Sequence, residues 1–259
     1  MLEPPATGTP FEFLLIGVIA GSISITAACL GLARWLYVKY NSTIGRRRVQ
    51  AKKLRRLACG VRAEYIEELL GASAYLNKSS GVDGSKSEER IYVLPDAFVR
   101  IHCAGESVVE AFTVTTRSKR FAPKLEIPWG GSSADKLLVR LGRTKYAELD
   151  QPMAASGWAG VRHWGYNEAH YLGNPGFYQT YILGSNDGSP VGWPPAPDWT
   201  PLLSGNNEID IAQPSPAWDI FRRAASPNTF CVVGPHVDWE RFRSYVGVEM
   251  DMLRVLPDE

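Results

Sequence analysis

The stretch FVRIHCAGESVVEAFTVTT, residues 98–116, decides the fold of this chain. Apolar and polar residues alternate over residues 98–103, and a run rich in β-branched residues covers residues 108–116. Alternation with a period of two is typical of a strand with one buried face. The Ala-Gly-Glu sequence at residues 104–106 predicts a turn. We therefore expect two antiparallel strands joined by a short connection.

The neighbouring residues extend this hairpin, and the extended pattern occurs twice. A short helix over residues 62–70 and a strand over residues 90–94 precede the hairpin, which gives a helix and a three-stranded meander. Similar residues return 79 to 81 positions later. The matches include Tyr65 with Tyr146, Glu89 with Glu168, Tyr92 with Tyr171, Phe98 with Phe177 and Gly105 with Gly184. Recurrence at a nearly fixed offset predicts two tandem units.

The predicted fold class is α+β. We expect an N-terminal transmembrane helix, two tandem helix-plus-antiparallel-meander units and a C-terminal strand–helix–strand. The expected boundaries are 1–12 for a disordered tail, 13–38 for the transmembrane helix, 39–60 for a basic juxtamembrane segment, 61–135 and 136–192 for the two units, and 193–259 for a Pro/Trp-rich loop with an α/β extension.

The membrane prediction rests on residues 13–33, which carry no charge. As a helix they would be about 30 Å long, the thickness of a bilayer core. No Lys or Arg precedes this stretch, whereas basic residues follow it densely. The positive-inside rule then predicts a single-pass protein of the inner (plasma) membrane, with its N-terminus outside and its body in the cytoplasm. A cleaved signal peptide and a lipoprotein signal ending at Cys29 are disfavoured alternatives, because the N-terminal region is acidic and the apolar run is long.

Two candidate contact surfaces accompany the predicted helix. A stripe of small residues would allow two such helices to approach closely and form a homodimer. These residues are Gly17, Gly21, Ser24, Ala28 and Gly31. A basic cluster would contact anionic lipid headgroups of the bilayer. Its residues are Arg46, Arg47, Arg48, Lys52, Lys53, Arg55 and Arg56. From residue 63 onward the chain has 18 basic and 25 acidic residues, which argues against nucleic-acid binding.

The chain shows no phosphate-binding loop, no cofactor motif and no metal-ligand template. Cys231, His236 and Asp238 surround one turn and could form a nucleophile–base set, but a buried thiol is the expected role of the cysteine. His163, Glu168 and His170 lie close in sequence, and structural roles are expected for them too. Trp193 and Trp199 lie in the Pro-rich loop and are candidates for an exposed partner-binding patch.

Three segments carry a resemblance: residues 65–71, the YLGNPGFYQ sequence at 171–179 and the SPNTF sequence at 226–230. They resemble an uncharacterised family of bacterial membrane-anchored proteins. The helix-and-meander unit also loosely resembles the small outer-membrane assembly lipoproteins, and its doubling resembles the tandem-repeat inhibitors of β-lactamase. Both of these are protein-binding modules, so the resemblance implies binding, although the inhibitor activity does not carry over to a chain with this basic cluster.

We therefore predict a membrane-anchored protein-interaction or scaffold module of unknown partner, with no cofactor. The alternatives are a membrane-tethered hydrolase that uses the turn at residues 231–238, and an envelope-facing binding module with inverted topology.

Overall fold

The computed structural model describes residues 29–80, 86–105, 107–128, 136–159, 164–173, 176, 178–189, 191, 207–242 and 246–247. The chain divides into two units, residues 1–49 and residues 50–259. In the first unit, residues 29–40 are α-helical, and the π-helical turn η1 (Asn41–Gly45) follows. Helix α2 (Arg46–Leu54) begins in the first unit and ends in the second.

No helix within the described ranges has both the length and the apolar character needed to cross a membrane. From residue 29, where the described residues begin, the helical stretch runs through Arg34 and Lys39 into the basic cluster, so the apolar part that is described is short. This finding contradicts the transmembrane helix predicted over residues 13–38. The predicted single-pass inner-membrane location and the predicted orientation are therefore wrong. Residues 13–28 of that span lie outside the described residues.

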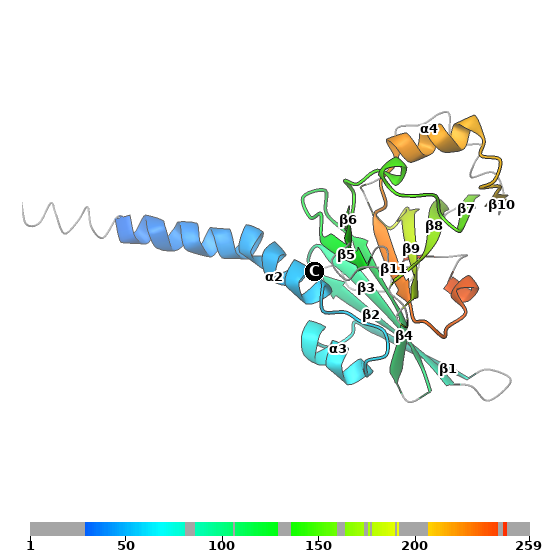
Figure 1. Ribbon diagram of the computed structural model, residues 1–259. Helices are drawn as coiled ribbons and strands as arrows, with labels where there is room; N and C mark the ends of the chain where they lie inside the picture. Colours follow the sequence, from blue (N-terminus) through cyan, green and yellow to red (C-terminus); the bar gives the residue numbers. More distant parts are fainter. Residues whose placement is uncertain are drawn as a thin grey trace, which may run out of the picture. The chain divides into compact units, whose positions relative to one another are not determined.

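The second unit is built on a nine-stranded antiparallel sheet in the order β1-β2-β3-β4-β11-β9-β8-β7-β10 (Figure 1). The strands are β1 (Tyr75–Ser80), β2 (Lys86–Leu94), β3 (Ala97–Ala104), β4 (Val108–Thr116), β7 (Ala154–Ala159), β8 (Trp164–Leu172), β9 (Gln179–Asn186), β10 (Asn207–Ile209) and β11 (Thr229–Val233). A separate hairpin pairs β5 (Lys124–Pro128) with β6 (Lys136–Arg140). The remaining elements are α3 (Ala63–Leu70), η2 (Tyr146–Glu148), α4 (Pro216–Ala224) and η4 (Trp239–Phe242).

The predicted meander is present as β2-β3-β4, but the prediction of two tandem units and a C-terminal extension is wrong. The structure has one continuous sheet, and β11, from the predicted extension, lies in its middle between β4 and β9. All five residues of β11, Thr-Phe-Cys-Val-Val, are buried. A strand covered on both faces needs no polar face, so such a short apolar run fits the centre of a sheet better than an added edge.

Side chains on the two faces of this sheet form different cores. The larger core packs α3, α4, η2 and the β5–β6 hairpin against one face, with Ile66 and Phe221 among the fully buried residues. The smaller core lies on the other face, where Phe242 of η4 and Val246 cover Cys231 and Val233. Because successive strand residues point to opposite faces, Phe230 and Val232 belong to the larger core and Cys231 to the smaller one.

Helix α4 is attached to the sheet by a buried ion pair. Arg222 Nε donates to Glu168 Oε1 at 2.8 Å, and Glu168 is completely buried on β8. The same carboxylate oxygen accepts a 2.6 Å hydrogen bond from the Tyr166 hydroxyl, which in turn accepts one from the Trp218 indole N–H. Arg222 also donates to three backbone carbonyls around η2. Since Arg222, Glu168, Tyr166 and Trp218 bond to one another or to the backbone, this arrangement holds α4 on the sheet.

We expect Arg222→Leu to lower the free energy of unfolding by about 3–5 kcal/mol, because it leaves the Glu168 carboxylate buried without its cation. Urea unfolding followed by circular dichroism measures this loss. The matched control is Lys136→Leu, which removes the exposed 3.1 Å Lys136–Glu126 pair and should cost far less than Arg222→Leu, because solvent screens exposed pairs. Equal losses of unfolding free energy in the two variants would contradict the structural role of the Arg222–Glu168 ion pair.

His102 on β3 provides a pH-dependent contribution to stability. Burial lowers the pKa of its imidazole to about 3, and the charges of Arg100 and Arg241 act in the same direction. Its ring packs edge-on against Phe242, with 4.9 Å between the ring centroids. The unfolded chain binds a proton at this residue near pH 6.5, whereas the folded chain does not. The contribution of His102 to the free energy of unfolding is therefore lost as the pH falls from about 6.5 toward 3.

We expect His102→Phe to reduce the slope of unfolding free energy against pH between pH 6 and pH 4 by up to about 1.4 kcal/mol per pH unit. Urea unfolding at several pH values gives this slope, and the exposed His236→Gln serves as the control. A slope in His102→Phe that equals that of the unsubstituted protein would show that the imidazole is protonated in the folded state.

Candidate functional site

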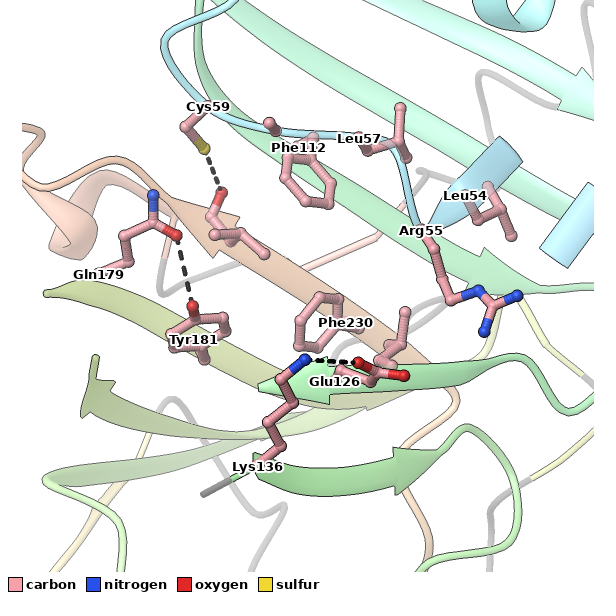
Figure 2. Close-up of a pocket in the computed structure, with 13 residues that line it drawn as sticks. Leu54, Arg55, Leu57, Cys59, Phe112, Glu126, Lys136, Gln179, Tyr181 and Phe230 are labelled. Atoms are coloured by element: carbon pink, nitrogen blue, oxygen red, sulfur yellow. Dashed lines mark hydrogen bonds and ion pairs between the residues drawn. The ribbon is translucent and has the colours of Figure 1, made fainter. Parts of the chain in front are cut away.

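A groove of about 520 Å³ opens between the segment that follows α2 and the β5–β6 hairpin (Figure 2). One wall consists of residues 54–59, and the other of Leu125, Glu126 and Lys136. Strands β4, β9 and β11 form its floor. This volume lies within the range of roughly 300–1,000 Å³ that is typical of ligand sites.

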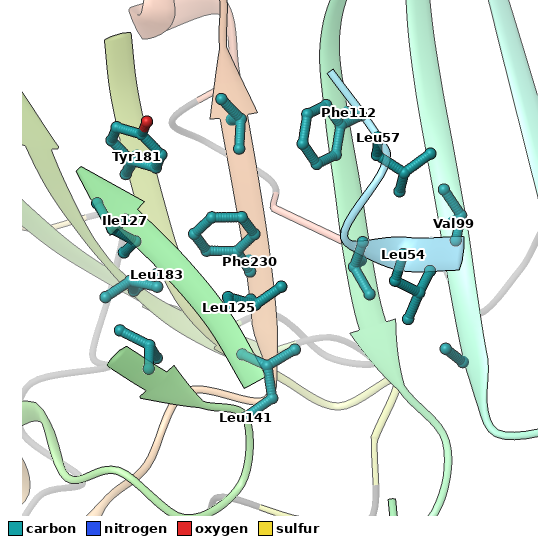
Figure 3. Packing of buried hydrophobic residues seen from close by; sticks show 14 of the residues in the cluster. Leu54, Leu57, Val99, Phe112, Leu125, Ile127, Leu141, Tyr181, Leu183 and Phe230 are labelled. Atoms are coloured by element: carbon teal, nitrogen blue, oxygen red, sulfur yellow. The ribbon is translucent and has the colours of Figure 1, made fainter. Parts of the chain in front are cut away.

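The floor of the groove is a row of apolar side chains across three neighbouring strands. Val232 of β11 lies opposite Phe112 of β4 on one side and Tyr181 of β9 on the other. Phe230 lies two residues along β11 on the same face, and its ring centroid is 5.9 Å from that of Tyr181. Figure 3 shows these rings beside the leucines of the two walls. The central position of β11 thus creates the floor.

The first wall is held in place by both backbone and side-chain contacts. Leu54 and Leu57 are buried in the larger core and anchor the chain as it leaves α2. The Gly60 N–H donates to the Val109 carbonyl at 2.8 Å, so the next residues run beside the start of β4. Gly60 has a φ of +79°, a backbone conformation that glycine adopts readily. The Cys59 thiol donates to the Val232 carbonyl at 3.5 Å, which ties the wall to the floor.

The second wall has one buried and one exposed side. Leu125 and Ile127 of β5 are buried against the sheet. Between them, Glu126 is 39% exposed and accepts a 3.1 Å hydrogen bond from the Lys136 ammonium. This hydrogen bond lowers the pKa of Glu126, and the charges of Lys124 and Arg55 lower it further. We call Arg55, Lys124 and Lys136 the basic rim, since the positive charges of all three lower the pKa of this one carboxylate.

Both the position of Cys231 and the pKa of its thiol argue against the hypothesis that this residue is a nucleophile. Cys231 is only 1% exposed and faces the smaller core, away from the groove floor. Burial raises the pKa of its thiol to about 11. His236 and Asp238, in contrast, are exposed. Burial raises the pKa of the Cys59 thiol too, so neither cysteine is activated as a thiolate.

Glu168 and His170, two of the three residues noted for lying close in sequence, belong to the buried network around Arg222. Glu168 and His170 do share one buried face of β8, with 3.5 Å between His170 Nε2 and Glu168 Oε2. Arg222 takes the place that a cation would occupy beside this carboxylate. His163 lies outside the described residues. Over the part of the chain that the structure describes, no group of three or more His, Cys, Asp and Glu side chains could hold a metal ion.

The other predicted site residues are only partly described. The basic cluster lies on α2 and the turn after it; Arg47 and Lys53 are half-buried and its other members are exposed. Only Arg55 of this cluster lines the groove. Gly31 is exposed on the helix of residues 29–40, whereas Gly17, Gly21, Ser24 and Ala28 lie outside the described residues. Trp193 and Trp199 lie outside them as well.

The groove itself was missed from the sequence, because its lining comes from separate stretches near residues 54–59, 112, 125, 136, 180 and 231. One signal was present: Leu54 lies within the basic cluster and Leu57 directly follows it, three residues later. Searches of protein-family models, of curated proteins and of solved structures gave no match for this chain. The functional argument therefore rests on the geometry.

We expect Cys231 in the folded protein to react with iodoacetamide at pH 8 at least 100-fold more slowly than the exposed Cys29. With a pKa of about 11, only about one Cys231 thiol in a thousand is ionised at pH 8, and burial blocks access. Mass spectrometry of timed samples gives both rates, and unfolding in urea should make them similar. Fast labelling of Cys231 in the folded protein would contradict this expectation and support the hypothesis that Cys231 is a nucleophile.

Proposed function

We propose that this protein is a protein-interaction module that binds a segment of a partner in the groove. The observation that supports this most strongly is the apolar floor of Phe112, Phe230, Val232 and Tyr181 beside a charged, solvent-exposed mouth. Apolar anchors in a concave site with a polar periphery are typical of recognition surfaces.

The chemistry of the lining favours binding over catalysis. Its ionisable groups are Arg55, Cys59, Glu126, Lys136 and Tyr181. Burial raises the pKa of Cys59, and it raises that of Tyr181 to about 12, so both remain protonated near neutral pH. Glu126 is engaged with Lys136 at the mouth. These groups can hold and orient a ligand, but they include no paired nucleophile and base.

A substitution that fills the groove tests this function. Ala58 is half-buried in the wall and lines the cavity, so Ala58→Trp would place an indole where the partner binds. The matched control is Ala72→Trp, at an exposed position after α3. We expect peptides selected from a displayed random library on the unsubstituted protein to bind Ala58→Trp at least tenfold more weakly, as measured by fluorescence anisotropy.

The control variant should bind these peptides within about twofold of the unsubstituted protein, since it leaves the groove open. Thermal unfolding of both variants verifies that they are folded. Peptides that bind Ala58→Trp and Ala72→Trp equally well would place recognition outside the groove and refute the proposed function.

A further inference from the structure

Strand β5 is paired on one side only. Its five residues pair with β6, and among the described residues no backbone group bonds to its other edge. The nine-stranded sheet does not extend to it. An unpaired strand edge presents N–H and C=O groups that can bind another extended chain.

The hydrogen-bonding pattern shows which groups are free. The Leu141 N–H donates to the Pro123 carbonyl at 3.3 Å, just beyond the paired residues of the two strands. In an antiparallel ladder, hydrogen-bonded and non-bonded pairs alternate. The backbone groups of Leu125 and Ile127 therefore turn toward β6. Those of Lys124 and Glu126 turn toward the open edge.

This open edge faces the groove. Leu125 and Glu126 both line the cavity, and the segment that carries Arg55 and Leu57 lines it from the opposite side. Figure 2 shows β5 between β6 and that segment. Because β6 occupies one edge of β5, the edge with the free groups lies toward the segment after α2.

The surroundings of the edge specify the chemistry of an added strand. Successive side chains of an extended chain point in opposite directions. In the groove, one set would point to the apolar floor around Phe230 and Val232, and the other toward the basic rim and solvent. The cations Arg55 and Lys136 line the groove beside the single carboxylate of Glu126, and this excess of positive charge favours acidic residues in the second set.

We propose that the partner is an extended peptide segment with alternating apolar and acidic residues, which pairs with the open edge of β5 inside the groove. This inference rests on the proposed function and adds the binding mode and the ligand class. Pro123 and Pro128 flank the open stretch, and neither has an N–H to donate. The added strand is thus short. Its backbone pairs with Lys124 and Glu126, and its apolar side chains contribute further affinity by packing on the groove floor.

A pair of substitutions at one position isolates the backbone contribution. Glu126→Pro removes the N–H that points to the open edge and leaves the hydrogen bonds between β5 and β6 intact, because a proline is tolerated where the N–H of an edge strand is free. Glu126→Gln removes the same charge and keeps the N–H. The probe is a fluorescein-labelled peptide of alternating Val and Glu residues, measured by fluorescence anisotropy with the full chain.

We expect Glu126→Pro to bind this peptide at least tenfold more weakly than Glu126→Gln does. A peptide with Lys in place of Glu should bind the unsubstituted protein at least tenfold more weakly. A second measurement does not depend on the folding of a variant: in the unsubstituted protein, the acidic peptide should slow amide hydrogen exchange at Lys124 and Glu126 at least tenfold. Exchange at Leu125 should not change.

Other outcomes overturn the inference in distinguishable ways. If Glu126→Pro and Glu126→Gln bind equally well while Ala58→Trp binds poorly, the groove is a binding site but strand addition is wrong. If Ala58→Trp also binds normally, the proposed function fails as well. A preference for the Lys peptide refutes the acidic partner. Self-association of the chain without peptide, abolished by Glu126→Pro in sedimentation experiments, would assign the edge to a second copy instead.

Discussion

The pairing of β11 with both β4 and β9 is the interaction on which the rest of the structure depends. It joins two antiparallel meanders, β2-β3-β4 and β7-β8-β9, into one sheet. Each of its five residues pairs on both sides. Polar side chains at its start strengthen this position. Asn186 Nδ2 donates to the Thr229 hydroxyl at 2.7 Å and to the Val246 carbonyl at 2.7 Å. The strand is thereby bound to its neighbour and to the segment that covers the smaller core.

The same strand builds the candidate site. Because its side chains alternate, Phe230 and Val232 supply the floor of the groove, while Cys231 is enclosed on the other face. Charged groups also fall into a buried set and an exposed set. Glu168 is fully buried and bound by Arg222, so it holds α4 in place. Glu126 and Lys136 are exposed at the groove mouth, where a partner can reach them. Burial thus separates the charges that stabilise the fold from those available for recognition.

Local patterns in the sequence predicted individual strands, but they did not predict which strands pair over long sequence separations. The alternation of residues 98–103 and the β-branched run of residues 108–116 correctly indicated β3 and β4. Strand β11 comes from the segment predicted as a C-terminal strand–helix–strand, but its partners are more than forty residues away in sequence and leave no periodic signal. The uncharged run of residues 13–33 predicted a membrane helix, which the described helix does not support. The groove could not be predicted, since it exists only after these distant segments meet.

Native-state hydrogen exchange of the full chain tests the central role of β11 most directly. If β11 joins the two halves, the amides of residues 229–233 exchange only through global unfolding, with the same opening free energy as the central residues of β3 and β9. The contradictory result would be exchange of β7, β8 and β9 at a lower opening free energy while β2, β3 and β4 stay protected. The two meanders would then be independent units, and the groove between them would have no fixed floor.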